Sequence, residues 1–321
     1  MNNLEFVANK NSDLAFKLAD YFKKQIYEIE VNHFADSETF IKQNKSEDLK
    51  QFKNFFITNQ FYFSNKSIYS SSINNQLFDF LFLIDSVKKI GAENITAFLP
   101  YLLYSRQEQN SFSKDKLGLL ELVINFLKIA GVNKLFVCEM HEIEVIKKLK
   151  LEVINIDLKD FWLEFLKSEK FKNLINCDFS QICFVSPDKG GKQRNKKIAQ
   201  ELGSSFAFIE KKRVSADNPI ALSLHGDIEG KVVIMIDDII DTGRTSVKAC
   251  EMILKNGAKK VFGCFSHAVL SSGAADLLKN SLFEFVFITN TILIDKNSLP
   301  NKFFVVSIDK YLSKYFNKLF T

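Results

Sequence analysis

The chain has 321 residues, of which 46% are hydrophobic and 25% are charged, and its formal net charge is +5. This composition is typical of a globular protein of one or two domains and excludes a disordered or collagen-like chain. The small positive charge is scattered among acidic residues, which argues against a nucleic-acid binder, and the longest apolar run, 78–84, is broken by Asp79 and too short to cross a membrane.

Short β-branched and aromatic runs alternate with longer amphipathic stretches along the chain. In chain order they predict helix 12–25, strand 55–58, helix 77–90, strand 95–99, helix 117–130, strands 134–140, 153–156 and 182–185, helix 193–202, strands 206–210 and 232–237, helix 245–256, strands 261–266, 285–289 and 303–308, and helix 311–319. Most of these strands are continuously apolar, as strands buried on both faces are. The sequence therefore predicts an α/β fold with mostly parallel sheets flanked by helices.

Three segments repeat one join between a helix and a strand. Each passes from a helix end through a glycine (Gly91, Gly131 or Gly257), a small apolar residue and a polar pair into a strand. Glycine can take the left-handed conformation that ends a helix. The repeats predict two similar α/β domains with a boundary near residues 155–175; the alternative is that any α/β protein repeats this join.

Cysteine usage and the amino terminus indicate the compartment. The five cysteines are an odd set without C-x-x-C spacing, which argues against a disulfide framework or a zinc site. The amino terminus has no basic region followed by an apolar stretch, so no secretory signal is expected. Both observations favour a reducing cytoplasm.

The segment 232–250, V-V-I-M-I-D-D-I-I-D-T-G-R-T-S-V-K-A-C, carries the strongest sign of chemistry. A buried strand runs into adjacent carboxylates, Asp237 and Asp238, and a tight turn after Asp241 leads into a helix. Amides in such a turn can hold a phosphate, whereas carboxylates suit sugar hydroxyls or a metal. The alternative, that the aspartates only cap the strand and helix, is disfavoured because the carboxyl end of a buried strand is the usual ligand crevice.

This segment resembles the ribose 5-phosphate loop D-D-x-x-D-T-x-G-T of the ribose-phosphate pyrophosphokinases, or phosphoribosyl pyrophosphate synthetases, and more loosely that of phosphoribosyltransferases. The resemblance implies two similar phosphoribosyltransferase-like domains, each a mostly parallel sheet flanked by helices. Residues 1–155 would bind ATP and residues 156–321 ribose 5-phosphate, and the last helix could pack back on the first domain. The implied ribose 5-phosphate ligands are Arg213, Asp237, Asp238, Asp241, Thr242, Gly243, Arg244 and Thr245.

Two more segments of the second half match the family. S-P-D-K-G-G-K-Q-R, at 186–194, resembles S-P-D-x-G-G, in which amides approach a diphosphate and Asp188 can bind Mg²⁺; alone it would be an ordinary turn. I-E-K-K-R, at 209–213, resembles D-K-R-R, although by composition it could be a solvated charge run. The resemblance implies that Lys211 and Arg213 are catalytic and neutralise the transferring phosphoryl group.

The first half adds motifs of an ATP site. L-Y-S-R-Q-E-Q resembles Y-A-R-Q-D-R and implies that Arg106 and Gln107 contact the nucleotide. E-M-H resembles D-L-H and implies that His141 joins Asp188 at Mg²⁺, although a lone His could equally be structural.

F-A-D-S-E, residues 34–38, resembles F-S-D-G-E, a loop that in the family reaches into a neighbouring subunit's ATP site. It implies ATP contacts and a homo-oligomer with that site at the subunit interface. The implied contacts are Phe34, Asp36, Ser37 and Glu38.

The motifs occur in the family's order, and H-A-V-L-S-S-G at 267–273 extends the match over nearly the whole chain. The sequence is nevertheless divergent. Arg244 stands where the family has Gly, Gln109 replaces an Arg and Glu139 replaces the Asp of D-L-H. The residues for chemistry are retained, whereas the segments linked to regulation and assembly are altered.

The resemblance implies a cytoplasmic diphosphotransferase with Mg²⁺ as cofactor and no nucleic-acid or membrane partner. It would move the β,γ-diphosphoryl group of ATP to the anomeric hydroxyl of ribose 5-phosphate, giving phosphoribosyl pyrophosphate and AMP. One alternative is a non-catalytic homologue that regulates an active synthetase, motivated by Arg244 and Gln109. The other is a phosphoribosyltransferase, for which the first half of the chain would lack a purpose.

Overall fold

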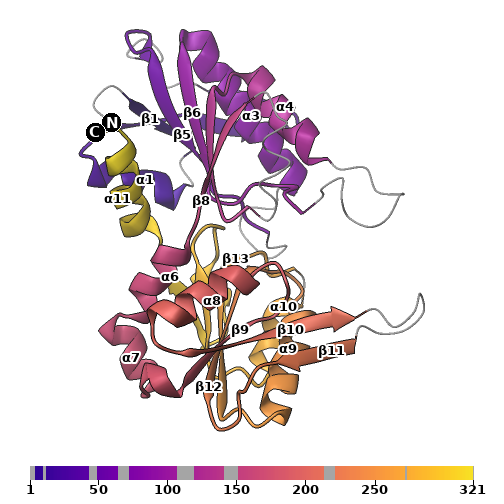
Figure 1. Ribbon diagram of the computed structural model, residues 1–321. Coiled ribbons are helices and arrows are strands. Elements are labelled where there is room, and N and C mark those ends of the chain that lie inside the picture. The colour runs from indigo at the N-terminus through magenta and orange to yellow at the C-terminus, as the bar shows by residue number, and fades with distance from the viewer. Residues whose placement is uncertain are drawn as a thin grey trace.

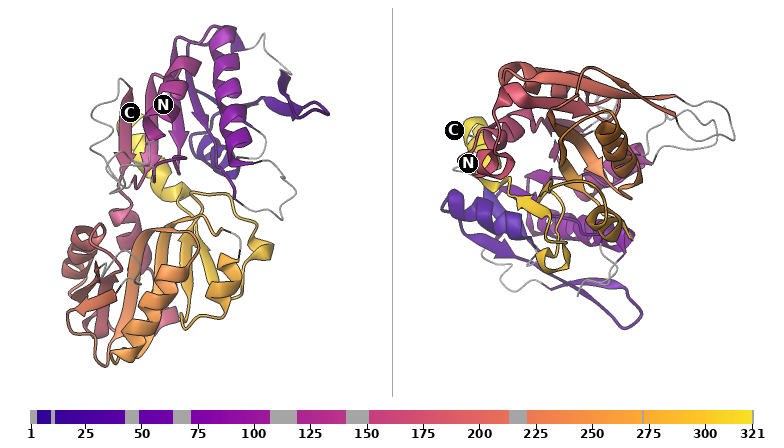
Figure 2. Two further views of the ribbon diagram at one scale, coloured as in Figure 1. Left: turned by 90° about the vertical axis from the view of Figure 1, so that its right-hand side faces the viewer. Right: turned by 90° about the horizontal axis from the view of Figure 1, so that it is seen from below.

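The computed structural model describes residues 4–9, 12–42, 49–63, 72–106, 119–140, 151–212, 221–271 and 273–320. They form two stacked α/β units, one built from strands β1–β8 and one from strands β9–β15 (Figure 1). We call them the first and the second unit. The amino-terminal and carboxy-terminal ends of the chain lie close together on one side of the first unit, as all views agree (Figures 1 and 2).

The first unit contains a six-stranded sheet in the order β2-β1-β5-β6-β7-β8, and every neighbouring pair in it is parallel. Its strands are β1 (Glu5–Ala8), β2 (Ile26–Glu28), β5 (Asn54–Thr58), β6 (Asn94–Leu99), β7 (Lys134–Cys138) and β8 (Glu152–Ile156). The flanking helices of this unit are α1 (Asp13–Tyr21), α3 (Ile73–Ile90) and α4 (Leu120–Ala130). An antiparallel hairpin of β3 (Glu30–His33) and β4 (Thr39–Lys42) stands apart from the sheet.

The inner strands β5, β6 and β7 of this sheet are buried on both faces. Phe55 and Phe56 are consecutive in β5 and both fully buried, yet they belong to two different apolar clusters. Successive side chains of a strand point to opposite faces, so one cluster lies under α3 and α4 and the other under α1. This explains the continuous apolar runs in the sequence.

The second unit contains a seven-stranded sheet in the order β11-β10-β9-β12-β13-β14-β15, in which the edge pair β10–β11 is antiparallel and the other pairs are parallel. Its strands are β9 (Ile182–Ser186), β10 (Ser205–Lys212), β11 (Ala221–His225), β12 (Val232–Ile240), β13 (Lys260–Ala268), β14 (Val286–Thr289) and β15 (Phe303–Val306). Its helices are α6 (Lys159–Leu166), α7 (Glu169–Ile175), α8 (Lys192–Glu201), α9 (Arg244–Lys255) and α10 (Ala274–Lys279), with short 3₁₀ turns at Phe179–Gln181 and Lys296–Ser298.

The last helix, α11 (Asp309–Phe320), joins the two units. Its Phe316 ring lies 5.3 Å from that of Phe56, 5.1 Å from that of Phe98 and 5.2 Å from that of Phe136, all in the first sheet. The same apolar cluster continues into the second unit through α6, α7 and α8. One core therefore crosses the junction, which favours a fixed arrangement of the units.

The predicted fold class is confirmed, and all ten predicted strands and six predicted helices are present with ends shifted by up to four residues. Gly91, Gly131 and Gly257 have φ of +119°, +127° and +90°, as expected for helix ends. The sequence reasoning missed β1–β4, β11, α6, α7 and α10. Most of these are short or half-exposed and carry little periodic signal. None of the helices that the structure describes is long and apolar enough to span a membrane.

Candidate active site

The strongest motif forms the carboxyl end of β12 and the turn that follows. Asp237 and Asp238 lie inside the strand, which pairs with β13 as far as Ile240, three residues beyond the predicted end. The turn then reaches Gly243, which has φ of +73° and precedes the first residue of α9. A Cβ added to Gly243 would lie 3.1 Å from the Leu278 side chain. Both the dihedral angle and the space therefore favour glycine at this position.

A pocket of about 410 Å³ opens above this turn. It brings together the turn, the Asp188 segment after β9 and Arg106 from the first unit. The residues that line it are Arg106, Pro187, Asp188, Asp237, Asp238, Ile239, Asp241, Thr242, Gly243, Thr245 and Ser246. Motifs that are far apart in the sequence thus share one polar cavity at the junction of the units.

Asp241 is held from both sides. Arg106 Nη1 donates to its Oδ2 at 2.7 Å, and the Ser271 hydroxyl donates to its Oδ1. Burial alone would raise the pKa of Asp241, but the Ser271 and Arg106 contacts outweigh burial and lower it. The pKa of Arg106 is raised because the contact with Asp241 outweighs the effect of burial. This ion pair connects the predicted nucleotide residue of one unit to the predicted phosphate turn of the other.

The surroundings of Asp237 shift its pKa in the opposite direction. Burial raises its pKa well above the usual value, and the nearby Asp238 and Asp188 carboxylates raise it further, with Arg194 opposing them. The side chain keeps a partial opening to the pocket. Because these carboxylates repel one another, the site favours a cation or a ligand rich in hydroxyl groups.

The Asp188 segment is a compact turn before α8. The Gly191 amide donates to Asp188 Oδ1 at 3.2 Å, and the Ser186 hydroxyl donates to the Asp188 carbonyl at 2.8 Å. A Cβ at Gly191 would lie 3.0 Å from Ser186 Oγ. Lys189 forms an ion pair of 2.7 Å with Glu210, which connects this turn to β10.

Sequence reasoning assigned no role to a second cross-unit pair, Arg194 and Glu139. Arg194 Nη1 donates to Glu139 Oε2, which also accepts from Ser266 Oγ at 2.8 Å. The Trp162 indole donates to the same Ser266 hydroxyl at 3.0 Å. The retention of Arg194 in a chain of only four arginines was the available signal. A smaller cavity of about 230 Å³ lies beside this pair and shares Asp238 with the pocket above.

The structure does not bring every predicted site residue to the pocket. Arg244 starts α9, is exposed and is absent from the residues that line the pocket. Lys211 lies in β10, where its backbone pairs with Leu222. Gln107, His141 and Arg213 fall outside the described residues.

The predicted adenine-binding loop is the tip of the β3–β4 hairpin, which projects from the first unit (Figure 2). Phe34 is 56% exposed and lies 4.4 Å from the Phe40 ring. Asp79 of α3 fixes both ends of the loop, because its Oδ1 accepts from Thr39 Oγ1 at 2.8 Å and lies 3.1 Å from His33 Nε2. None of Phe34, Asp36, Ser37 and Glu38 lines the pocket of its own chain.

Metal-ligating groups are sparse in the described ranges. No cluster of three or more His, Cys, Asp or Glu side chains that could hold a metal ion is found there. Mg²⁺ needs few protein ligands, since it commonly binds one or two carboxylates together with water and substrate phosphates. One or two of the crowded Asp188, Asp237 and Asp238 carboxylates would supply such ligands.

Comparisons with known proteins match both halves of the chain. Residues 5–131 match the family described as the N-terminal domain of ribose phosphate pyrophosphokinase, and residues 188–320 match the phosphoribosyl synthetase-associated domain. The ribose-phosphate pyrophosphokinase of Thermotoga maritima is 32% identical over 94% of this chain and 90% of the relative. That of Thermosipho africanus is 31% identical over 96% of this chain and 92% of the relative.

A solved structure of a protein with a related name has the same fold as this chain. The phosphoribosylpyrophosphate synthetase of Mycobacterium smegmatis superposes with a TM-score of 0.84 and 26% identity, and 99% of each chain is covered. The fold and the pocket define a transferase of the kinase type, assembled from two α/β units. More narrowly, the chain belongs to the family of ribose-phosphate pyrophosphokinases.

Proposed function

We propose that the protein transfers the β,γ-diphosphoryl group of ATP to the anomeric hydroxyl of ribose 5-phosphate, giving phosphoribosyl pyrophosphate and AMP. The observation that carries this proposal is the pocket of about 410 Å³ in which Arg106 meets the Asp188 turn and the turn after β12. The family names of the relatives support the same reaction. Residues 1–155 would serve ATP and residues 156–321 ribose 5-phosphate.

The sugar phosphate has two chemically different ends, and the pocket offers groups for both. Asp237 and Asp238 would accept hydrogen bonds from ribose hydroxyls. The turn Asp241–Thr245 would hold the 5-phosphate through amides at the start of α9 and through the Thr242 and Thr245 hydroxyls. Arg244 would add charge from the rim.

Mg²⁺ would be held by Asp188 together with His141 and the phosphates of ATP. When bound, it would neutralise phosphate charge. Arg106 and Gln107 would contact the nucleotide, which means that Arg106 must exchange Asp241 for ATP on binding. Lys211 and Arg213 would stabilise the charge that spreads over the transferring phosphoryl oxygens, and Arg213 would also contact ribose 5-phosphate.

The hairpin would act in a second subunit. Phe34 would stack on adenine, with Asp36 and Glu38 accepting from its amino group and Ser37 at the turn between them. These residues are exposed and lie away from the pocket of their own chain, which supports an ATP site shared between subunits of a homo-oligomer. We also place the protein in the cytoplasm, supported by five free cysteines.

A coupled assay of AMP formation from ATP and ribose 5-phosphate tests the reaction. We expect turnover that requires both substrates and Mg²⁺. A folded protein without turnover on any sugar phosphate would overturn the enzyme assignment and favour the regulatory homologue, whereas diphosphate release that depends on a nucleobase would favour a phosphoribosyltransferase.

Removal of the hairpin anchor should weaken ATP binding selectively. In Asp79→Ala the loop Phe34–Glu38 loses the acceptor shared by His33 and Thr39. Because the loss of one or two hydrogen bonds corresponds to about 1–2 kcal/mol, we expect KM for ATP to rise about tenfold with kcat nearly unchanged. Initial-rate kinetics would measure this split.

Two variants of the same helix control this experiment. Asp79→Asn keeps an Oδ1 acceptor and should restore most of the ATP affinity. Asp85→Ala removes an exposed ion pair with Lys89 and should leave KM unchanged. Equal KM values in Asp79→Ala and the wild type would separate the hairpin from ATP binding.

A further inference from the structure

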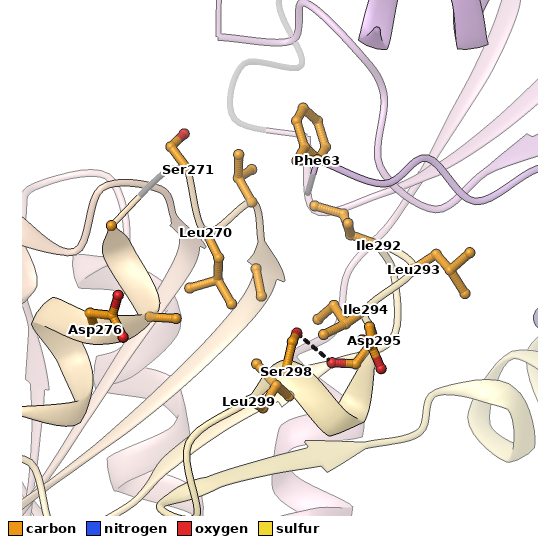
Figure 3. Close-up of a pocket in the computed structure, with 14 residues that line it drawn as sticks. Phe63, Leu270, Ser271, Asp276, Ile292, Leu293, Ile294, Asp295, Ser298 and Leu299 are labelled. Atoms are coloured by element: carbon orange, nitrogen blue, oxygen red, sulfur yellow. Dashed lines mark hydrogen bonds between the residues drawn. The ribbon is translucent and has the colours of Figure 1, made fainter. Parts of the chain in front are cut away.

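A third cavity lies beside the proposed active site and is larger than the two described above. It has a volume of about 530 Å³ and lies between the units, with one wall from the second unit and Phe63 from the first (Figure 3). The residues that line it are Phe63, Ala268, Val269, Leu270, Ser271, Gly273, Ala275, Asp276, Ile292, Leu293, Ile294, Asp295, Ser298 and Leu299. The proposed reaction uses none of them directly.

The lining defines the chemistry of a ligand. Most side chains are apolar, and Ile292, Ile294 and Leu299 lie opposite Leu270 across the cavity (Figure 3). The ionisable side chains among the lining residues are the carboxylates of Asp276 and Asp295, and the described lining contains no Lys or Arg. The volume lies within the range of small-molecule sites. Such a cavity favours an uncharged or cationic, largely apolar molecule and disfavours a phosphate ester.

One wall is directly bonded to the phosphate turn. The Ile240 carbonyl accepts from the Val269 amide at 3.0 Å and from the Leu270 amide at 3.2 Å. The residues that follow Leu270 and Ile240 are also bonded to each other, because the Ser271 hydroxyl donates to the Asp241 carboxylate. A displacement of this wall would therefore move the residue that holds Arg106.

The opposite wall is fixed to the first unit. The Leu293 amide donates to the Phe61 carbonyl at 2.9 Å, and Ile292 belongs to the apolar core of the first unit. Leu270, in the wall that is bonded to the phosphate turn, has φ of +48°, a left-handed conformation that a branched side chain rarely adopts. Such backbone outliers persist where the surroundings enforce them and often mark ligand-responsive segments.

We propose that this cavity is an effector site for an uncharged or cationic, largely apolar molecule without phosphate groups. Its occupant spans the two walls and, through Leu270 and Ser271, shifts Asp241 and thereby the affinity for ribose 5-phosphate. The binding step is independent of the proposed function, and only the coupling rests on it.

Three related probes test the binding step: tryptamine, which is cationic, indole-3-acetamide, which is neutral, and indole-3-acetate, which is anionic. Ligand-observed NMR titration of the full chain should show binding of the first two and at least tenfold weaker binding of the third. Ala275→Phe fills the cavity and should abolish binding, whereas Leu277→Phe changes a residue of the same helix that does not line the cavity and should leave it intact.

The coupling is measured by KM for ribose 5-phosphate with and without saturating tryptamine. We expect a change of at least threefold in the wild type and no change in Ser271→Ala, although the probe still binds there. Absence of binding by tryptamine and indole-3-acetamide, or equal binding in Ala275→Phe, would overturn the site. If Ala275→Phe instead changed the oligomeric mass, a second copy of the chain would be the occupant. Binding without turnover would leave the site standing and refute the proposed function instead.

Discussion

Lys211→Ala is expected to lower kcat for diphosphoryl transfer about 10³-fold, while KM for ATP changes less than about threefold. In phosphoryl transfer, negative charge spreads over the equatorial oxygens of the phosphorus in the transition state. A cation that acts mainly on that charge contributes to kcat rather than to ground-state binding. Lys211 follows Glu210, whose ion pair with Lys189 connects β10 to the Asp188 turn, where we propose that Mg²⁺ binds.

The neighbouring Lys212 provides the matched control. Lys212→Ala removes the same charge from the next position of β10, to which the proposed reaction assigns no role. We expect kcat of Lys212→Ala to stay within about twofold of the wild type, as for a substitution away from the reacting groups. Equal kcat values for Lys211→Ala and the wild type, or equal losses in both variants, would exclude Lys211 as a catalytic residue.

The fold was predictable because its determinants are local. Strands buried on both faces, such as β9 and β12, produce continuous apolar runs that no surface element has. The turn after β12 was predictable for the same reason, since strand, carboxylates, glycine and helix start follow one another in a single segment. The position of Arg244 was not predictable in this way. Whether the first residue of α9 faces the pocket or the solvent depends on how the helix is oriented, and Arg244 is exposed.

The connections between motifs were not predictable, because they join distant residues. Arg106 and Asp241 are 135 positions apart, and Arg194 and Glu139 are 55 apart. No periodicity relates such pairs, and only the stacking of the two units brings them into contact. The contact of Asp79 with the hairpin was unpredictable for the same reason. The periodicity of α3 identifies its apolar face, but it does not tell which distant residue a polar side chain such as Asp79 contacts.

These long-range contacts divide the carboxylates of the pocket into two groups. Asp241 has two donors and a lowered pKa, so its charge favours the folded state. Asp237 is crowded by Asp238 and Asp188 and has a raised pKa, so its charge opposes the folded state. The charge of Asp237 therefore lowers the stability of the folded state at the position where we propose that the ribose hydroxyls bind.

Asp237→Asn is therefore expected to stabilise the ligand-free protein and to inactivate it. Removal of the crowded charge should raise Tm by about 3 °C at pH 8, while kcat/KM for ribose 5-phosphate should fall about 100-fold because charged hydrogen bonds to the sugar are lost. Since the folded protein binds this proton more tightly than the unfolded chain, the cost of ionisation grows as pH rises from about 4 through the raised pKa. The gain in Tm should thus be larger at pH 8 than at pH 5.

Asp241→Asn supplies the control of opposite sign. Its lowered pKa means that the ionised carboxylate stabilises the folded state above about pH 4, and that this contribution is lost as pH falls through the folded pKa. Asp241→Asn should therefore lower Tm at pH 8, and the loss should shrink in more acidic buffer. Calorimetry of Asp237→Asn at pH 8 and pH 5, and of Asp241→Asn at pH 8 and below about pH 4, separates the electrostatic effects from packing, because a packing change would move Tm equally at both pH values. A Tm of Asp237→Asn below that of the wild type at pH 8 would show that the carboxylates of the pocket do not repel one another, and would remove the electrostatic support for a cation between them.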